Sequence, residues 1–299
     1  MRADLPEVRK QPFRFGVGLT ASQSRHDWVT KCRKAEDLGY DVLGVADHLA
    51  MPAPFPALVL AAETTSRPRL STAVLNTGFY RPALLARDVA TTDQLTEGRL
   101  ELGLGTGYVR DELAEAGLPW PSPRERVDHL EHTVTELRRL LADPSYRPQP
   151  TRPGGPPLFL GGSGDRLLAL AAREADIVGF TGFSHGRQGQ LGPLDTAERL
   201  ARRIDHARGL LGPRLTEVEL NILVWRVKLT ADRRAEANKL APVRGLSAEQ
   251  LLAVPTVLIG TARQIAEQLL EHQEKLGISY VTVSEYNLET LAPIIELLH

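Results

Sequence analysis

A short strand, a glycine-rich turn and the start of a helix are encoded in the stretch Leu158-Phe159-Leu160-Gly161-Gly162-Ser163-Gly164-Asp165-Arg166. Three apolar residues predict the strand, and the apolar pattern of residues 167–171 predicts the helix. Glycine lets backbone N–H groups approach an anion closely, and a helix dipole favours negative charge at its N-terminus. The stretch therefore predicts a phosphate site, although a tight strand-to-helix turn without a ligand fits it equally well.

The composition is that of an ordinary globular protein. The chain has 299 residues, of which 42% are hydrophobic and 24% charged, and its formal net charge is −1. This balance argues against a nucleic-acid or membrane-surface partner. The single cysteine, Cys32, excludes an intrachain disulfide framework. Because neither a secretory segment nor a bilayer-spanning apolar run is evident, we expect a cytoplasmic protein without a membrane partner.

Eight strand-like segments alternate with helical patterns along the whole chain, which favours parallel βα units. The expected strands are residues 13–19, 42–46, 70–75, 100–104, 158–160, 177–180, 218–227 and 280–283. Their number and the chain length predict an α/β fold, a (β/α)8 TIM barrel with insertions, as one domain over residues 1–299. A doubly wound open sheet is the alternative, but the Gly-x-Gly-x-x-Gly that it would need after its first strand is missing.

Four segments fall outside this alternation. We expect residues 1–12 to be a flexible N-terminus, and residues 108–123, 182–193 and 241–260 to be loops or insertions. Residues 182–193 hold several glycines and few apolar side chains. This composition predicts a mobile lid over the barrel mouth.

Polar and small residues follow the expected strands, where the chemistry of a barrel is placed. They are Asp47, His48, Asn76, Thr106, Gly107, Gly161, Gly162, Ser163, Gly164, Thr181, Ser284 and Glu285. His48 is the candidate general acid or base, and Asp47 would orient it, although such a pair can also simply anchor a loop. No metal is expected, because His129 and His132 fit a charged helix face better than a metal site.

Seven segments together resemble a known family. They are residues 13–18, 35–41, 45–48, 80–86, 98–107, 161–164 and 257–261, in the order in which the family carries them. On these segments the chain resembles the bacterial luciferase-like monooxygenase superfamily, within it the branch that uses the deazaflavin coenzyme F420. The resemblance implies a luciferase-like TIM barrel whose cofactor phosphate lies on the glycine-rich turn and whose ring system lies over the barrel mouth.

The resemblance also implies roles for single residues. Asp47 and His48 would border the ring and substrate, and a non-proline cis peptide near Val74-Leu75 would back the ring. The implied cofactor-binding residues are Val74, Leu75, Asn76, Thr106, Gly107, Gly161, Gly162, Ser163 and Gly164. Relatives that oxidise glucose-6-phosphate have Glu directly after Gly-Thr-Gly, where this chain has Tyr108, so the resemblance does not extend to an acid at that position or to a sugar phosphate substrate.

The function implied is that of an F420-dependent oxidoreductase, which moves a hydride between deazaflavin C5 and a small organic or peptide-borne substrate, reducing an imine or activated C=C bond. The alternatives are an FMN-dependent monooxygenase that uses oxygen, and a flavin- or deazaflavin-binding protein without catalysis. A basic rim of Arg110, Arg166 and Arg187 would suit the anionic tail of F420.

A homodimer is expected through the helices at residues 56–65 and 82–95, because residues 55–62 are unusually apolar.

Overall fold

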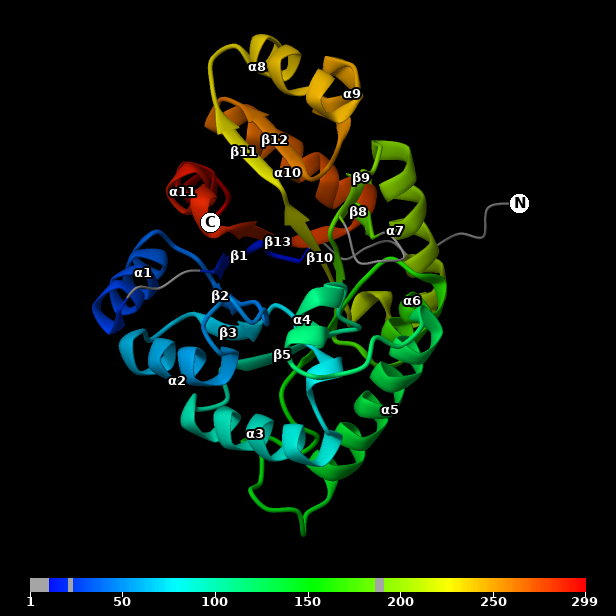
Figure 1. Ribbon diagram of the computed structural model, residues 1–299. Coiled ribbons are helices and arrows are strands. Elements are labelled where there is room, and N and C mark those ends of the chain that lie inside the picture. Colours follow the sequence, from blue (N-terminus) through cyan, green and yellow to red (C-terminus); the bar gives the residue numbers. More distant parts are fainter. Residues whose placement is uncertain (1–10, 21–23, 186–190) are drawn as a thin grey trace.

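A closed parallel barrel forms the body of the molecule in the computed structural model, which describes residues 11–20, 24–185 and 191–299 (Figure 1). The strand order is β3-β2-β1-β13-β10-β7-β6-β5-β4, and pairing of β3 with β5 closes the ring. This confirms the predicted (β/α)8 barrel. The strands are β1 (Arg14–Leu19), β2 (Val42–Val45), β3 (Arg69–Thr72), β4 (Leu75–Asn76), β5 (Leu100–Gly105), β6 (Leu158–Gly161), β7 (Ile177–Phe180), β10 (Glu219–Val224) and β13 (Ile278–Ser284).

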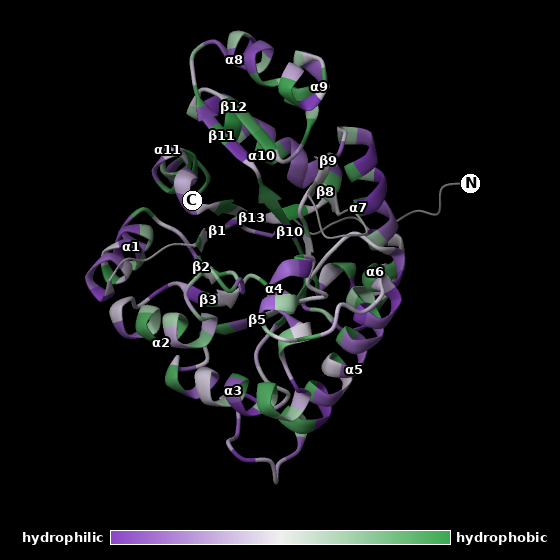
Figure 2. Cartoon of the chain, viewed as in Figure 1, coloured by the Kyte–Doolittle hydropathy of each residue, from purple (hydrophilic) through white to green (hydrophobic). Residues whose placement is uncertain are grey.

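Helices surround the strands, with apolar residues interleaved among polar ones (Figures 1 and 2). They are α1 (Arg25–Asp37), α2 (Pro54–Thr64), α3 (Pro82–Leu95), α5 (Pro123–Ala142), α6 (Asp165–Glu174), α7 (Ala197–Leu211), α10 (Ala262–Leu276) and α11 (Leu288–Leu298). Local sequence sets several of their starts. Before α5, for example, the Ser122 hydroxyl accepts from the Glu125 N–H while the Glu125 carboxylate accepts from the Ser122 N–H. Across the described ranges, no helix is long and apolar enough to cross a membrane.

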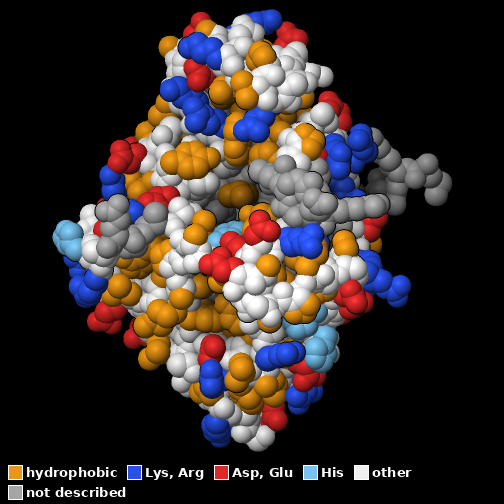
Figure 3. All heavy atoms as spheres, viewed as in Figure 1, with side chains coloured by type: hydrophobic (Ala, Val, Ile, Leu, Met, Phe, Trp, Pro, Cys, Tyr) orange, Lys and Arg blue, Asp and Glu red, His pale blue; other side chains and the backbone are white. Residues whose placement is uncertain are grey.

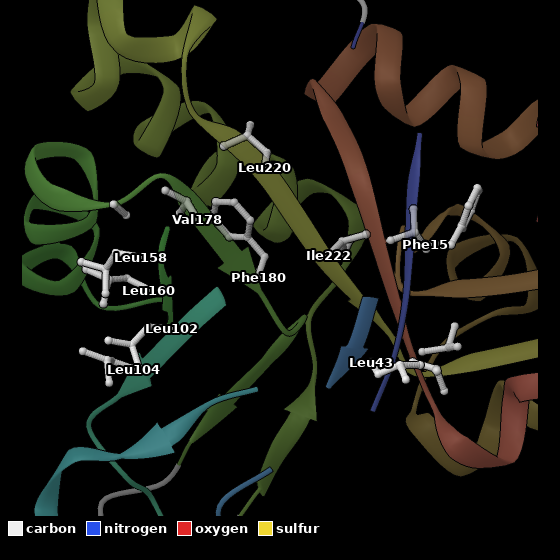
Figure 4. Packing of buried hydrophobic residues seen from close by; sticks show 14 of the residues in the cluster. Phe15, Leu43, Leu102, Leu104, Leu158, Leu160, Val178, Phe180, Leu220 and Ile222 are labelled. Carbon is white, nitrogen blue, oxygen red and sulfur yellow. The ribbon is translucent and has the colours of Figure 1, made fainter. Parts of the chain in front are cut away.

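The main core lies between the strands and the helices. Leu102 and Leu104 of β5 stand in register with Leu158 and Leu160 of β6, and all four side chains are buried (Figure 4). Alternate residues of a strand point to opposite faces, so Phe159 faces the barrel interior instead. There its ring lies 6.3 Å from the ring of Tyr280 of β13. Each fully buried leucine stabilises the fold by about 1.5–3 kcal/mol.

An insertion unit stands on the barrel between β10 and α10, at the top of Figure 1. It consists of β11 (Arg226–Leu229), α8 (Arg233–Leu240), α9 (Ala248–Ala253) and β12 (Val257–Gly260). The expected strand 218–227 is interrupted at Trp225, after which the chain leaves the barrel as β11 and pairs with β12. Residues 241–260, expected to be a loop or an insertion, belong to this unit and contain α9 and β12, and their apolar residues contribute to a small core of its own.

Two other expected loops contain regular structure. Residues 108–123 include the short helix α4 (Arg110–Glu115), which lies in front of the barrel in Figure 1. Residues 182–193 overlap a hairpin of β8 (Phe183–His185) and β9 (Leu191–Leu194), whose ends are held by the buried side chains of Phe183 and Leu194. Residues 186–190, which include Arg187 of the expected basic rim, lie outside the described residues, as do the first ten residues of the chain.

Candidate active site

The third barrel strand is interrupted between β3 and β4, at the mouth of the barrel. A non-proline cis peptide joins Ala73 and Val74, one residue before the expected position. Beside this bulge, the Thr72 hydroxyl accepts from the Gly103 N–H (2.7 Å) and donates to the Gly103 carbonyl (2.9 Å). The hydroxyl thereby satisfies two groups of β5 that a regular partner strand would otherwise satisfy. The side chain of Val74 packs at the barrel interior near Phe159, whereas the side chain of Leu75 is buried in the main core.

The loop after β5 closes around the side chain of Asn76. Gly107 has a φ of +67°, and a Cβ at this position would lie 2.2 Å from the Asn76 Oδ1. Only glycine leaves this space. Thr106, directly before it, is half-buried. Helix α5 holds the same region, because Arg126 donates to the Gly107 carbonyl.

His129 also belongs to this support. Its Nε2 lies 3.0 Å from the Thr77 carbonyl oxygen, which can only accept, so the ring donates there. Among the described residues, no group of His, Cys, Asp and Glu side chains could hold a metal ion.

His48 is held by two side chains from the segment after β5. Its Nδ1 lies 2.9 Å from Oε1 of Glu112 on α4, and its Nε2 lies 3.3 Å from the Tyr108 hydroxyl. Because a carboxylate only accepts, Nδ1 carries the hydrogen, and Nε2 of the neutral ring accepts from Tyr108. Burial raises the pKa of the Tyr108 hydroxyl, and the nearby Glu112 charge raises it further.

Asp47 has a different task from the expected one. Its Oδ2 accepts from the Asn76 N–H (3.0 Å), and its carboxylate also bonds the side chain of Tyr80. Burial raises the pKa of the Asp47 carboxyl, although the hydrogen bond from Asn76 acts in the opposite direction. The expectation that Asp47 orients the His48 ring was wrong, because Glu112 bonds that ring. Asp47 instead ties the end of β2 to the bulge of the third strand.

In the glycine-rich turn after β6, the last two residues, Ser163 and Gly164, are exposed to solvent. Gly162 has a φ of +155°, and a Cβ there would lie 2.7 Å from Leu167 Cδ1, so a larger residue would strain the backbone and push against the Leu167 side chain of α6. Its N–H already donates to the Gly179 carbonyl (3.1 Å). In the described parts of the chain, the N–H groups of Ser163 and Gly164 have no acceptor, and Gly164, the residue before α6, provides no side-chain cap for that helix. These groups are the available donors for an anion.

The bulge and the turn are neighbours. A Cβ at Gly161 would lie 3.7 Å from Val74 Cγ1, and one at Gly164 would meet no atom within 4 Å. The turn therefore presents the N–H groups of Ser163 and Gly164 to solvent beside the bulge of the third strand.

The remaining strand-end residues are anchors. Glu285 accepts from the Thr20 N–H (2.8 Å) and pairs with Lys31 of α1 (2.8 Å), and the Thr181 hydroxyl contacts the Phe183 carbonyl. Arg166 of the expected rim pairs with Asp128 of α5 (2.7 Å).

Figure 3 looks onto this end of the barrel, where charged side chains of both signs surround a hollow.

The closed barrel makes this a (β/α)8 protein, a class in which ligands bind at the carboxyl ends of the strands. A family model described as luciferase-like monooxygenase matches residues 10–280, so the chain belongs to the luciferase-like monooxygenase family.

Curated relatives include two bacterial proteins named F420-dependent glucose-6-phosphate dehydrogenase. That of Intrasporangium calvum is 34% identical over 186 residues, 54% of this chain and 56% of the relative. That of Kineococcus radiotolerans is 28% identical over 232 residues, 67% of either chain. The chain thus spans little more than half the length of the first relative.

Solved structures share the fold over almost the whole chain. Monooxygenase RslO1 from Streptomyces bottropensis superposes with a TM-score of 0.71 at 19% identity, covering 95% of this chain and 97% of its own. An F420-dependent secondary alcohol dehydrogenase in complex with an F420-acetone adduct gives 0.69 at 18% identity, covering 97% and 100%. At such identities the likeness establishes the fold alone.

Proposed function

We propose that the protein is an F420-dependent oxidoreductase, which transfers a hydride between C5 of the deazaflavin and a small organic or peptide-borne substrate. The observation that carries the proposal is that Glu112 holds the His48 imidazole at the same barrel end as the turn before α6, where the Ser163 and Gly164 N–H groups have no acceptor among the described residues. The relatives named F420-dependent dehydrogenases support this choice of cofactor.

The residues at the mouth fit such a cofactor. The N–H groups of Ser163 and Gly164, together with the first turn of α6, would bind its phosphate. Gly161 and Gly162 would shape this turn. Val74, Asn76, Thr106 and Gly107 would line the ring, because the bulge and the Asn76–Gly107 contact bring them together at the strand ends. Leu75 would contribute only through its backbone, because its side chain is buried in the main core. When bound, F420 would supply the hydride carrier.

His48 would move the accompanying proton. Reduction of an imine or activated C=C bond adds a hydride to one atom and a proton to the other, so the reaction needs a proton donor beside the substrate. Protonated His48 donates from Nε2, while Glu112 at Nδ1 stabilises the positive ring and fixes its orientation. Tyr108 would hold Nε2 in position until the substrate binds.

The proposal is tested with reduced F420 under air and a panel of cyclic imines and activated alkenes. We expect oxidation of the deazaflavin that depends on the substrate and consumes no oxygen. Stoichiometric oxygen uptake with reduced FMN, and no reaction with reduced F420, would instead support a monooxygenase. Cofactor binding that is unaffected by every substitution at His48, without turnover of any panel member, would support a binding protein without catalysis.

A further inference from the structure

A groove lies between β11 of the insertion unit and the start of α11. It has a volume of about 440 Å³ and is lined by Arg226, Val227, Lys228, Leu229, Tyr286, Asn287, Glu289 and Thr290. Neither the predicted strand ends nor the proposed cofactor site includes these residues. The volume suits a small charged group with part of the molecule that carries it.

The charge of the groove is positive. Arg226 and Lys228 alternate along β11, so both side chains stand on the same face of the strand. Within the described residues, neither of them has a carboxylate within ion-pair distance. The only acidic residue of the lining, Glu289, is already paired with Lys34 of α1.

Buried hydrogen-bond donors add to this charge. Asn287 is 2% exposed, and its side-chain oxygen, Oδ1, accepts from the Val227 N–H (3.3 Å). Its side-chain nitrogen, Nδ2, is buried without an acceptor in the described structure, and so is Nε of Arg226. A buried donor left unpaired is costly, so an anion that recruits these donors would gain binding energy.

The groove adjoins the barrel mouth on a different side from the phosphate turn. The hydroxyl of Tyr286, which follows β13, donates to the carbonyl of Trp225, which follows β10 (2.5 Å). In the ring of strands, β10 and β7 separate β13 from β6, which carries the phosphate turn. A cofactor phosphate on the turn therefore leaves the groove free.

We infer that the groove binds an anionic group of the substrate, a carboxylate or a phosphate, while the reacting carbon lies over the mouth. This inference rests on the proposed function for the position of the reacting carbon. The cofactor's own anionic tail is the second source of such a group, and the test separates the two.

The test is calorimetric titration of inorganic phosphate into protein that has been saturated with F420, so that the turn on α6 is filled. Arg226→Gln combined with Lys228→Gln should weaken phosphate binding about tenfold or more. The matched control is Arg234→Gln combined with Lys239→Gln on α8, which removes the same charge from the same unit. It should leave the affinity unchanged. Equal affinity in all three proteins, or no binding to the parent, would overturn the inference.

Two further arms separate the alternatives. If the double variant at Arg226 and Lys228 loses affinity for F420 but keeps its affinity for the deazaflavin without glutamates, the groove holds the cofactor tail and the substrate assignment is wrong. If the parent protein does not bind F420 at all, the proposed function fails, and phosphate titration of the cofactor-free variants still decides whether the groove is an anion site.

Discussion

The ring of His48 is fixed from both nitrogens by residues of one short segment, Tyr108 and Glu112. We predict that His48→Gln lowers the turnover of reduced F420 about 10²–10⁴-fold, because loss of a general acid typically costs this much. Affinity for F420 should stay within a few-fold, since the ring and phosphate contacts lie on other residues. The measurement is single-turnover oxidation of bound, reduced F420 by an imine substrate, with binding followed by fluorescence.

The same assay assigns the partner of His48. Glu112→Gln should lower turnover and alter its pH profile, because the positive ring loses its counter-charge. Asp47→Asn should disturb cofactor binding more than the pH profile, because Asp47 bonds the Asn76 N–H and not the His48 ring. Full activity of the His48 variant would remove the acid–base role, and equal pH profiles for the two carboxylate variants would remove the distinction between Glu112 and Asp47.

At Gly162 the backbone conformation and the Leu167 side chain both disfavour a larger residue. A Cβ there would lie 2.7 Å from Leu167 Cδ1, and the φ of +155° disfavours a β-branched residue. We predict that Gly162→Val weakens F420 binding about tenfold or more, equivalent to roughly 1.4 kcal/mol. Gly209→Val is a control in helix α7, where a Cβ meets no atom within 4 Å. Unchanged affinity in a folded Gly162 variant would contradict the phosphate site.

At the scale of single elements, helix α10 carries a buried histidine. Burial lowers the pKa of His272 to about 4, and its Nδ1 has no partner in the described structure. In the unfolded chain a histidine has a pKa of about 6.5, so below that pH the unfolded state takes up a proton that the folded state refuses. The free energy of unfolding therefore falls as the pH drops from about 6.5 towards 4.

We predict that proton uptake by His272 in the unfolded chain makes the free energy of unfolding about 2 kcal/mol smaller at pH 5 than at pH 7. Urea unfolding at the two pH values would measure the change, and His272→Gln should remove that share of it while keeping a polar side chain. Parallel losses of stability in the parent and the variant would show that other groups cause the pH dependence.

Most of the barrel could be predicted from the sequence, but part of the site could not. Alternation and apolar runs report which residues are buried. They placed seven of the barrel strands to within about two residues, whereas the expected strand 218–227 runs three residues past the end of β10. They do not report a partner that is distant in the chain. Glu112 lies in a six-residue helix inside a proline-rich connection, and it contacts a histidine 64 positions earlier. No local pattern marks that pairing, so Asp47, the sequence neighbour of His48, was assigned instead.

The regular structure of the insertion unit could not be predicted, for a related reason. The apolar residues on both sides of Trp225 read as one strand, since a change of pairing partner leaves no trace in the pattern. The groove beside α11 arises only when β11 and the end of β13 are brought together. Its cations on β11 look like ordinary surface residues in the sequence.

At the scale of the whole molecule, closure of the barrel brings Asp47, His48, Asn76 and the turn after β6 to one end. The outer face keeps an apolar area over α2 and α3 (Figure 3). On α3 the side chains of Leu84 and Leu95 are 53% and 60% exposed. We propose that this face forms a homodimer.

Light scattering at micromolar protein should therefore report twice the chain mass, and Leu84→Glu should shift the population towards monomer. Leu297→Glu on α11 is the matched control, because Leu297 is also 53% exposed. A monomeric parent protein, or equal effects of the two substitutions, would contradict the proposed interface.

The choice of cofactor is the claim on which the proposed function depends. Titration of the purified protein with F420 and with FMN, followed by the fluorescence of each ring system, tests it most directly. We predict saturable binding of F420, weakened by Gly162→Val, and much weaker binding of FMN. Tight binding of FMN with no response to F420 would contradict the proposed function and support an oxygen-using member of the family.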